Sequence, residues 1–225
     1  MNTITPSLID FIETDIIPQY AHFDSAHREE HVRSVIAGSL KLAPLYPVNI
    51  DMVYAIAAYH DLGMCEERAT HHLVSGRMVR SDKRLKQWFT TEEIAIIAEA
   101  VEDHRASSDH KPRSIYGKIV AEADRIIEPA TIIRRTVQYG LCHYPHLKRE
   151  EHIARALEHL DEKYAEGGYL KLWIPESSNA ERLRELQEII RNRAEIRRIV
   201  AEIFDMETAT EGENLTQSTA TKTTD

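Results

Sequence analysis

Apolar side chains recur every three or four positions along most of this sequence, and this spacing constrains the fold more than any other feature. The segments 51–60 and 91–104 show it clearly. Such spacing places the apolar side chains on one face of an α-helix. Gly and Pro, which end helices, occur only eight times each in 225 residues, and no segment shows convincing strand alternation. We therefore predict an all-α fold.

Capping residues and helix breakers indicate where the helices begin and end. We expect helices over 7–17 (which Pro18 ends or closely follows), from Asp24 or Ser25 to 43, over 51–60, 71–84 and 91–104, and from Pro112 to Pro129. Two or three more follow, broken near 167–168 and Pro175, and a last one covers 179–204. Thr90-Thr91-Glu92-Glu93 is a capping box that opens the 91–104 helix.

The organisation that follows is a single helical domain with a tail. Residues 1–206 form the domain, with a core over about 24–135 and a helical extension over about 136–206. Residues 207–225 are rich in threonine and poor in apolar side chains. Such a segment cannot bury enough apolar surface to order itself, so we expect a disordered tail.

Charge and cysteine content limit the partners and the compartment. The formal net charge is -9, which argues against a broad nucleic-acid surface. Two cysteines, Cys65 and Cys142, form no CxxC motif, and neither a signal peptide nor a membrane-spanning run is evident. We expect a cytoplasmic protein without membrane contact, and a homo-oligomer remains open. Cys65 is interpreted as a small buried residue.

Histidines and aspartates lie at the buried edges of several predicted helices. His60 and Asp61 end the apolar run AIAAYHD, and His31, His104 and Asp124 each lie one helical turn from apolar positions of their own helices. Unpaired buried polar groups are costly, so their recurrence on four helices indicates convergence on a cation. Histidine and carboxylate ligands suit a divalent ion, with Mn, Fe, Ni, Co, Zn and Mg as candidates.

The order of these residues resembles the HD-domain metal-dependent phosphohydrolase superfamily, and within it the small stand-alone hydrolases of bacterial type. SAHREEHVRSV resembles the segment with the first ligand, AIAAYHDLG the signature pair, and AEAVEDH followed by GKIVAEADRI the closing part. The resemblance covers about 24–135. It implies an HD-domain-like helical bundle, here with additional C-terminal helices.

The resemblance also implies roles for particular residues. A first divalent ion would be bound by His31, His60, Asp61 and Asp124. Many family members bind a second ion; His71 and His104 occupy the corresponding places, with Asp61 as the bridge. His72 is a rival to His71, but Ser75 and Gly76 align better with the family pattern if His71 is the ligand.

The implied chemistry is attack of a metal-bound water on a phosphate group, with His60 and Asp61 as catalytic residues. Asp61 would orient the water or accept its proton. The substrate would be a small phosphorylated molecule, and the family favours a nucleotide. Cationic side chains would bind its phosphates; the preferred candidates are His27, Arg28, Lys118, Arg125 and Arg135, with Arg105 and Arg134 as further ones.

The sequence departs from known subclasses at Met64, where cyclic-dinucleotide phosphodiesterases usually carry Lys and some nucleotidases carry Glu. The subclass therefore stays open. The main alternative function is a metal-stabilised regulatory module that binds a nucleotide or a protein with little catalysis. An HD-type oxygenase with two irons is a third hypothesis, which no sequence feature favours.

Overall fold

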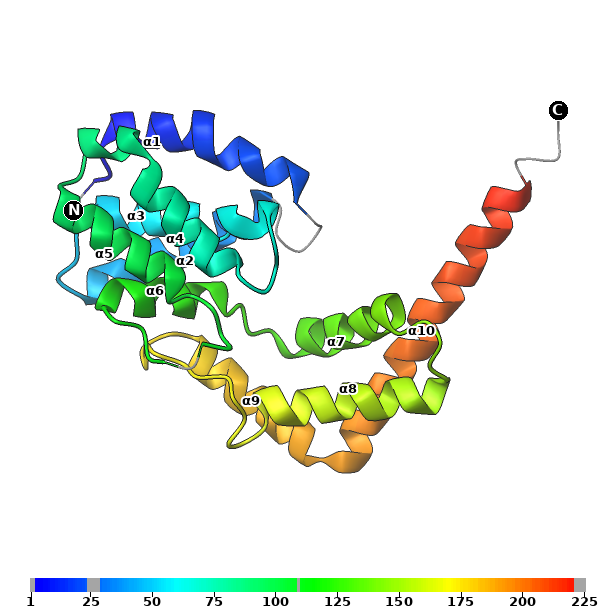
Figure 1. Ribbon diagram of the computed structural model, residues 1–225. Helices are drawn as coiled ribbons and strands as arrows, with labels where there is room; N and C mark the ends of the chain where they lie inside the picture. Colours follow the sequence, from blue (N-terminus) through cyan, green and yellow to red (C-terminus); the bar gives the residue numbers. More distant parts are fainter. Residues whose placement is uncertain (1–2, 24–28, 109, 221–225) are drawn as a thin grey trace. The chain divides into compact units, whose positions relative to one another are not determined.

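A computed structural model describes the backbone of residues 3–23, 29–108 and 110–220, with side chains up to residue 209. All regular secondary structure in these residues is helical (Figure 1), which confirms the predicted all-α fold. The chain divides into two compact units: one contains residues 1–126 and 171–177, and the other 127–170 and 178–225. No helix in the described ranges is both long and apolar enough to cross a membrane.

The first unit begins with a helical segment of changing pitch. It comprises α1 (Pro6–Phe11), a π-helical turn η1 (Ile12–Ile16) and a 3₁₀ segment η2 (Ile17–His22). The prediction of a helix over 7–17, which Pro18 ends or closely follows, needs one correction, because the chain stays helical beyond Pro18. Pro18 lies in the first turn of η2, where its missing N–H would have no helical partner, so the chain continues as helix to His22.

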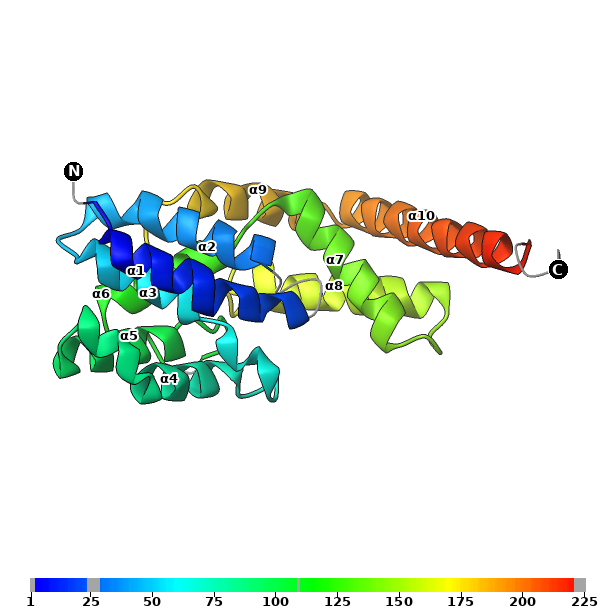
Figure 2. The same cartoon turned by 90° about the horizontal axis from the view of Figure 1, so that it is seen from above.

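Five helices form the rest of the first unit (Figure 2). They are α2 (Glu29–Leu42), α3 (Ile50–Tyr59), α4 (His71–Ser81), α5 (Thr91–Glu102) and α6 (Ile115–Asp124), with 3₁₀ turns η3 (Ala43–Leu45), η4 (Leu62–Cys65) and η5 (Lys83–Gln87) between them. Helix α3 is central, because every residue from Met52 to Tyr59 is buried and it contacts α2, α5 and α6. Its position places the end of α3 in the core.

Several predicted helix ends are confirmed and others are corrected. The capping box is present, since Thr90 Oγ accepts from the N–H of Glu93 and Glu93 accepts from the N–H of Thr90. Helix α6 begins at Ile115 instead of Pro112, because the Ser114 side chain caps it, and it ends at Asp124. The predicted start of the second helix at 24 or 25 lies outside the described residues.

The second unit contains α7 (Pro129–His143), α8 (Arg149–Tyr164), α9 (Asn179–Arg191) and α10 (Arg193–Ala220). The single helix predicted over 179–204 is wrong: it breaks at Asn192, whose ψ of 86° is not helical. The Asn192 side chain accepts from the N–H of Glu195 and so caps α10. Helix α10 extends to Ala220; the predicted domain and tail boundaries stay predictions.

Residues 171–177 belong to the first unit because Glu122 of α6 binds them. The buried Glu122 carboxylate accepts from the backbone N–H of Trp173 at 2.7 Å and of Ile174 at 3.3 Å, and from the Ser177 hydroxyl. Ile174 is fully buried in a small apolar cluster that contains Val53 of α3. We call residues 171–177 the return segment.

Candidate metal centre

The centre is built around the end of helix α3. His60 follows the last helical residue, Tyr59, and is fully buried, and Asp61 is buried directly after it. Because α3 is buried from Met52 to Tyr59, the two polar side chains that follow are carried into the core of the first unit. They meet side chains from α2, α4, α6 and the end of α5.

Close packing of α2 against α6 brings His31 to Asp124. A Cβ atom on Gly38 would lie 3.2 Å from the Cβ of Ala123, so only a small residue at 38 allows the two helices this approach. His31 lies two turns before Gly38, and its Nε2 is 3.2 Å from Asp124 Oδ1.

A second close approach brings the start of α4 to Asp61. A Cβ on Gly63 would lie 2.1 Å from the carbonyl oxygen of His71, which leaves no room for a side chain. The Gly63 N–H also donates to Ser75 Oγ at 2.8 Å. The glycine after the His-Asp pair therefore allows η4 to lie directly on α4.

Six side chains converge in two groups of three. His31, His60 and Asp124 form the first group, and Asp61, His71 and His104 form the second. In the first group, His60 Nε2 lies 3.3 Å from His31 Nε2 and 3.9 Å from Asp124 Oδ1. In the second, Asp61 Oδ1 lies 3.3 Å from Nε2 of both His71 and His104.

Asp61 lies between the two groups. Its Oδ2 is 3.3 Å from His60 Nε2 and 3.5 Å from His31 Nε2, whereas its Oδ1 faces the second group. One carboxylate oxygen is therefore directed at each group. A carboxylate shared in this way can bridge two cations.

Backbone carbonyls fix the orientation of three of the four imidazoles. Nδ1 of His60, His71 and His104 lies 2.8, 2.7 and 2.6 Å from the carbonyl oxygens of residues 57, 68 and 101. A carbonyl can only accept, so each Nδ1 carries the proton and, in the neutral ring, Nε2 carries a lone pair.

This arrangement fits bound cations. His71 Nε2 and His104 Nε2 lie 3.0 Å apart, and two lone pairs at that distance repel each other unless a proton or a cation lies between them. Metal-binding histidines usually donate their other N–H to a carbonyl or carboxylate, as these do. Four imidazoles and two carboxylates are a donor set for divalent ions such as Mn, Fe, Co, Ni or Zn.

Both carboxylates of the centre have pKa values below their usual range. Burial raises the pKa of Asp61, but the charge of His60 and hydrogen bonds from neighbouring histidines lower it well below its usual range. Burial likewise opposes ionisation of Asp124, yet the hydrogen bond from His31 lowers its pKa to about 2. Burial lowers the pKa of His31, but Asp124 and Asp61 outweigh it and raise that pKa to about 9.

The structure distinguishes His71 from its rival. His71 directs Nε2 at Asp61, whereas the half-buried His72 has a buried Nδ1 without a hydrogen-bond partner among the described residues. The geometry therefore brings His71 to the centre, as the alignment of Ser75 and Gly76 suggests.

Unlike the six convergent residues, the predicted substrate-binding residues do not share one environment. His27 and Arg28 lie outside the described residues, and Lys118 is half-buried on α6. Arg125 is buried, and its guanidinium donates back to the Ala121 carbonyl. Arg135 is exposed on α7, in the other unit.

The two further candidates also have partners of their own: Arg105 donates to the Ala69 carbonyl, and Arg134 pairs with Glu207 in the second unit. Cys65 is exposed, so its interpretation as a buried residue is wrong; it lies at the end of η4, where the chain leaves the core.

Asp103 holds the loop that follows α5, a role that sequence reasoning missed. Its carboxylate accepts from the Arg113 N–H at 2.6 Å and from Arg113 Nε at 2.9 Å. A Cβ on Gly117 would lie 2.9 Å from Asp103 Oδ2. Asp103 thereby fixes the turn from α5 to α6 beside His104. The only sequence signal was a carboxylate next to a candidate ligand.

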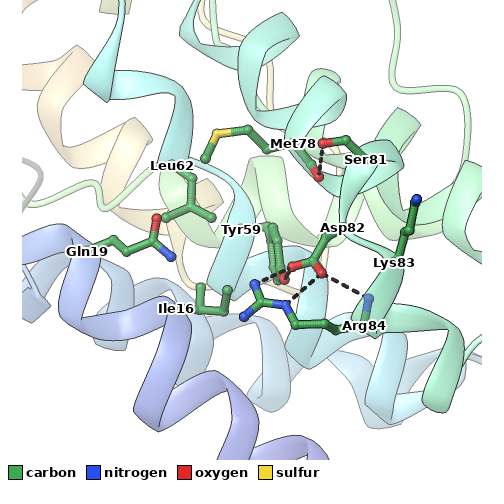
Figure 3. A pocket seen from close by; sticks show the side chains of 9 residues that line it. All are labelled: Ile16, Gln19, Tyr59, Leu62, Met78, Ser81, Asp82, Lys83 and Arg84. Carbon is green, nitrogen blue, oxygen red and sulfur yellow. Dashed lines mark hydrogen bonds and ion pairs between the residues drawn. The ribbon is translucent and has the colours of Figure 1, made fainter.

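A separate cavity of about 430 Å³ lies between the N-terminal segment and α4 (Figure 3). Tyr59 and Leu62, which flank the His60-Asp61 pair, are among its walls, but none of the six convergent residues is. Asp82 accepts from the Tyr59 hydroxyl at 2.7 Å and pairs with Arg84. Since these polar groups already satisfy one another, this cavity is not the candidate centre.

Fold and site together define a class: an all-α protein in which histidines and aspartates from several helices could hold divalent ions. Residues 28–127 match the model of the HD domain family, and all six convergent residues lie within that range. Residues 28–127 are therefore similar to an HD domain, as the resemblance implied, and HD domains are generally metal-dependent hydrolases. No curated protein and no solved structure matched the chain.

Proposed function

We propose that this protein is a phosphohydrolase that binds two divalent metal ions and hydrolyses a small phosphorylated substrate, with a nucleotide as the preferred class. The observation that carries the proposal is the shared position of Asp61. Its Oδ2 faces the group of His31, His60 and Asp124, and its Oδ1 faces His71 and His104.

The bound ions would lower the pKa of a coordinated water and polarise a phosphoryl oxygen. The protein's own contribution is orientation. His60, His71 and His104 are held by backbone carbonyls, so their Nε2 atoms need no rearrangement to bind. Asp61, with only 4% of its side chain exposed, is proposed to orient the attacking water.

Exposure indicates the side from which a substrate would approach. The side chains of His31, His71 and Asp124 are 17%, 12% and 23% exposed, whereas those of His60 and His104 are 0% and 3% exposed. The buried pair forms the floor of the centre. A phosphate would therefore reach the ions past His31, His71 and Asp124.

The charge of the centre is compatible with an anionic substrate despite the net charge of -9. Two divalent cations would exceed the charge of Asp61 and Asp124, and bound ions commonly reverse the local field. Lys118 and Arg105, together with His27 and Arg28, are proposed to bind the phosphates. The nucleotide preference rests on the family alone.

The test measures metal content and turnover in the same preparations. We expect purified protein loaded with Mn²⁺ or Co²⁺ to hydrolyse an aryl phosphate or members of a nucleotide panel. His60→Ala and Asp61→Ala should abolish turnover and lower the bound metal, while His22→Ala, an exposed histidine outside the centre, should retain both. Full activity of the His60/Asp61 double variant would reject the proposal. Nucleotide binding without product would favour the regulatory module.

A further inference from the structure

Tyr20 is a fully buried residue that belongs to the N-terminal helical segment. It lies in η2 and has 0% of its surface exposed. It precedes residues 28–127, the range that matches the HD domain family. Whatever Tyr20 contributes to the centre is therefore supplied by a part of the chain outside the matched domain.

The hydroxyl of Tyr20 binds the backbone on both sides of His60. It donates to the carbonyl oxygen of Ala58 at 2.8 Å and accepts from the N–H of Asp61 at 3.3 Å. The carbonyls at the end of a helix lack intrahelical partners and must be satisfied otherwise. Here the His60 ring satisfies Ala57, and Tyr20 satisfies Ala58.

These bonds act on the residue that both metal groups share. A backbone N–H held at a fixed point limits rotation of the Asp61 peptide, and thus limits where its carboxylate can lie. On the other side of the turn, the Gly63 N–H is held by Ser75. The turn that carries Asp61 is therefore fixed between the N-terminal segment and α4.

We infer that Tyr20 is a positioning residue for the metal centre, and that the N-terminal segment is a working part of that centre. The inference rests on the proposed function, since it needs the six residues to bind metal. Tyr20 would not touch the ions or the substrate. It would act through the backbone of Asp61, as outer-shell partners of metal ligands generally do.

The variant that tests this is Tyr20→Phe, with Tyr54→Phe as the matched control. Tyr54 is also buried, and its hydroxyl donates to Glu13, so it joins α3 to the same N-terminal segment. Tyr54 lies six residues before His60 on α3 and binds neither Ala58 nor Asp61. Both substitutions remove one tyrosine hydroxyl that joins α3 or its end to the N-terminal segment.

The main readout is Mn²⁺ affinity, measured by calorimetry and by the electron paramagnetic resonance spectrum of the bound ions. We expect Tyr20→Phe to weaken Mn²⁺ binding by about tenfold and to change the spectrum, while Tyr54→Phe binds like the wild type. Equal Mn²⁺ affinity in Tyr20→Phe and the wild type would overturn the inference. So would an equal loss in both variants, which would indicate a purely structural role.

A measurement on the unaltered protein covers the case in which Tyr20→Phe does not fold. Coupling between two sites is reciprocal, so Mn²⁺ should slow amide hydrogen exchange in the peptide that contains residues 16–22. Unchanged exchange there, with Mn²⁺ bound and residues 57–63 protected, would overturn the inference alone. A wild type that binds no Mn²⁺, Co²⁺ or Zn²⁺ would instead reject the proposed function itself.

Discussion

Three of the four histidines in the centre share one local device: the Nδ1 of each bonds the carbonyl three residues earlier. This hydrogen bond requires each histidine to lie at a helix end or turn, where its ring can reach the backbone of the preceding residues. It sets the tautomer before any ion arrives. At the scale of single residues, three histidine rings of the centre are therefore oriented by backbone carbonyls close to them in the sequence.

The shared role of Asp61 predicts how metal content responds to substitution. His104→Ala should leave about one ion per chain, because the group of His31, His60 and Asp124 remains. Asp61→Ala removes an oxygen from both groups and should leave less than one. Elemental analysis of gel-filtered protein measures both values. Two ions in Asp61→Ala would contradict the bridging arrangement.

Asp82 predicts a dependence of stability on pH. Burial raises the pKa of Asp82, but hydrogen bonds from Arg84 and Tyr59 outweigh it, so the pKa lies below its usual value. A lowered pKa in the folded state stabilises the fold above the unfolded pKa of about 3.9, and this stabilisation is lost as pH falls through the folded value.

Asp82→Asn should therefore be less stable than the wild type at pH 7, and the difference should shrink below about pH 4. Thermal unfolding at pH 7, 5, 4 and 3 gives this comparison. Asp10→Asn, a change at an exposed position, serves as the control and should show little difference throughout. A gap for Asp82→Asn that widens in acid would refute the assignment.

At the scale of elements, apolar spacing predicts the helices of the first unit well, because each buries one face in a common core. Apolar spacing does not reveal the end of a helix when the same spacing continues into the next helix, as it does across Asn192. The side chain that caps the next helix there adds no periodic signal. Proline favours first turns, which makes Pro112 a candidate helix start, but the Ser114 side chain provides the cap and α6 begins at Ile115.

The six convergent residues could be picked out from the resemblance, since family spacing carries them. Tyr20, Asp103 and Glu122 could not, because their partners are set by the folded packing. Glu122 bonds residues more than fifty positions away, and nothing local to Glu122 indicates this. A carboxylate in an apolar helix looks the same in sequence whether it binds a metal or a backbone.

The contact between η4 and α4 predicts a large effect of Gly63→Ala. A Cβ there would meet the His71 carbonyl, which is backbone and cannot rotate away. We expect a loss of about 3 kcal/mol or more in unfolding free energy and displacement of His71 from the centre. Gly38→Ala, whose Cβ would be 3.2 Å from Ala123 Cβ, should cost less. Denaturant unfolding and metal content would show whether the two positions differ.

At the scale of the whole molecule, the division into two units does not follow the order of the chain, because the return segment belongs to the first unit. A single buried carboxylate, Glu122, accepts the hydrogen bonds that three residues of this segment donate to α6. The neighbouring Glu176 is exposed and accepts from the Tyr46 hydroxyl at 3.0 Å. Substituting Glu122 and Glu176 one at a time therefore distinguishes the buried attachment of the return segment from the exposed one.

Glu122→Ala should destabilise the first unit by roughly 3 kcal/mol, because two backbone N–H groups and the Ser177 hydroxyl lose their acceptor. Hydrogen exchange in residues 171–177 should rise sharply. Glu176→Ala should change the unfolding free energy by less than about 0.5 kcal/mol. Unchanged exchange in Glu122→Ala would show that apolar contacts of Ile174 alone hold the segment.

The return segment also bears on how the protein is made. Domains generally fold as units while the chain emerges from the ribosome, beginning at the N-terminus. Here the first unit lacks its last piece until residue 177 has been synthesised, more than fifty residues after Asp124. The partners of Glu122 are synthesised only after α7 and α8, so the first unit stays incomplete while much of the second unit is being translated.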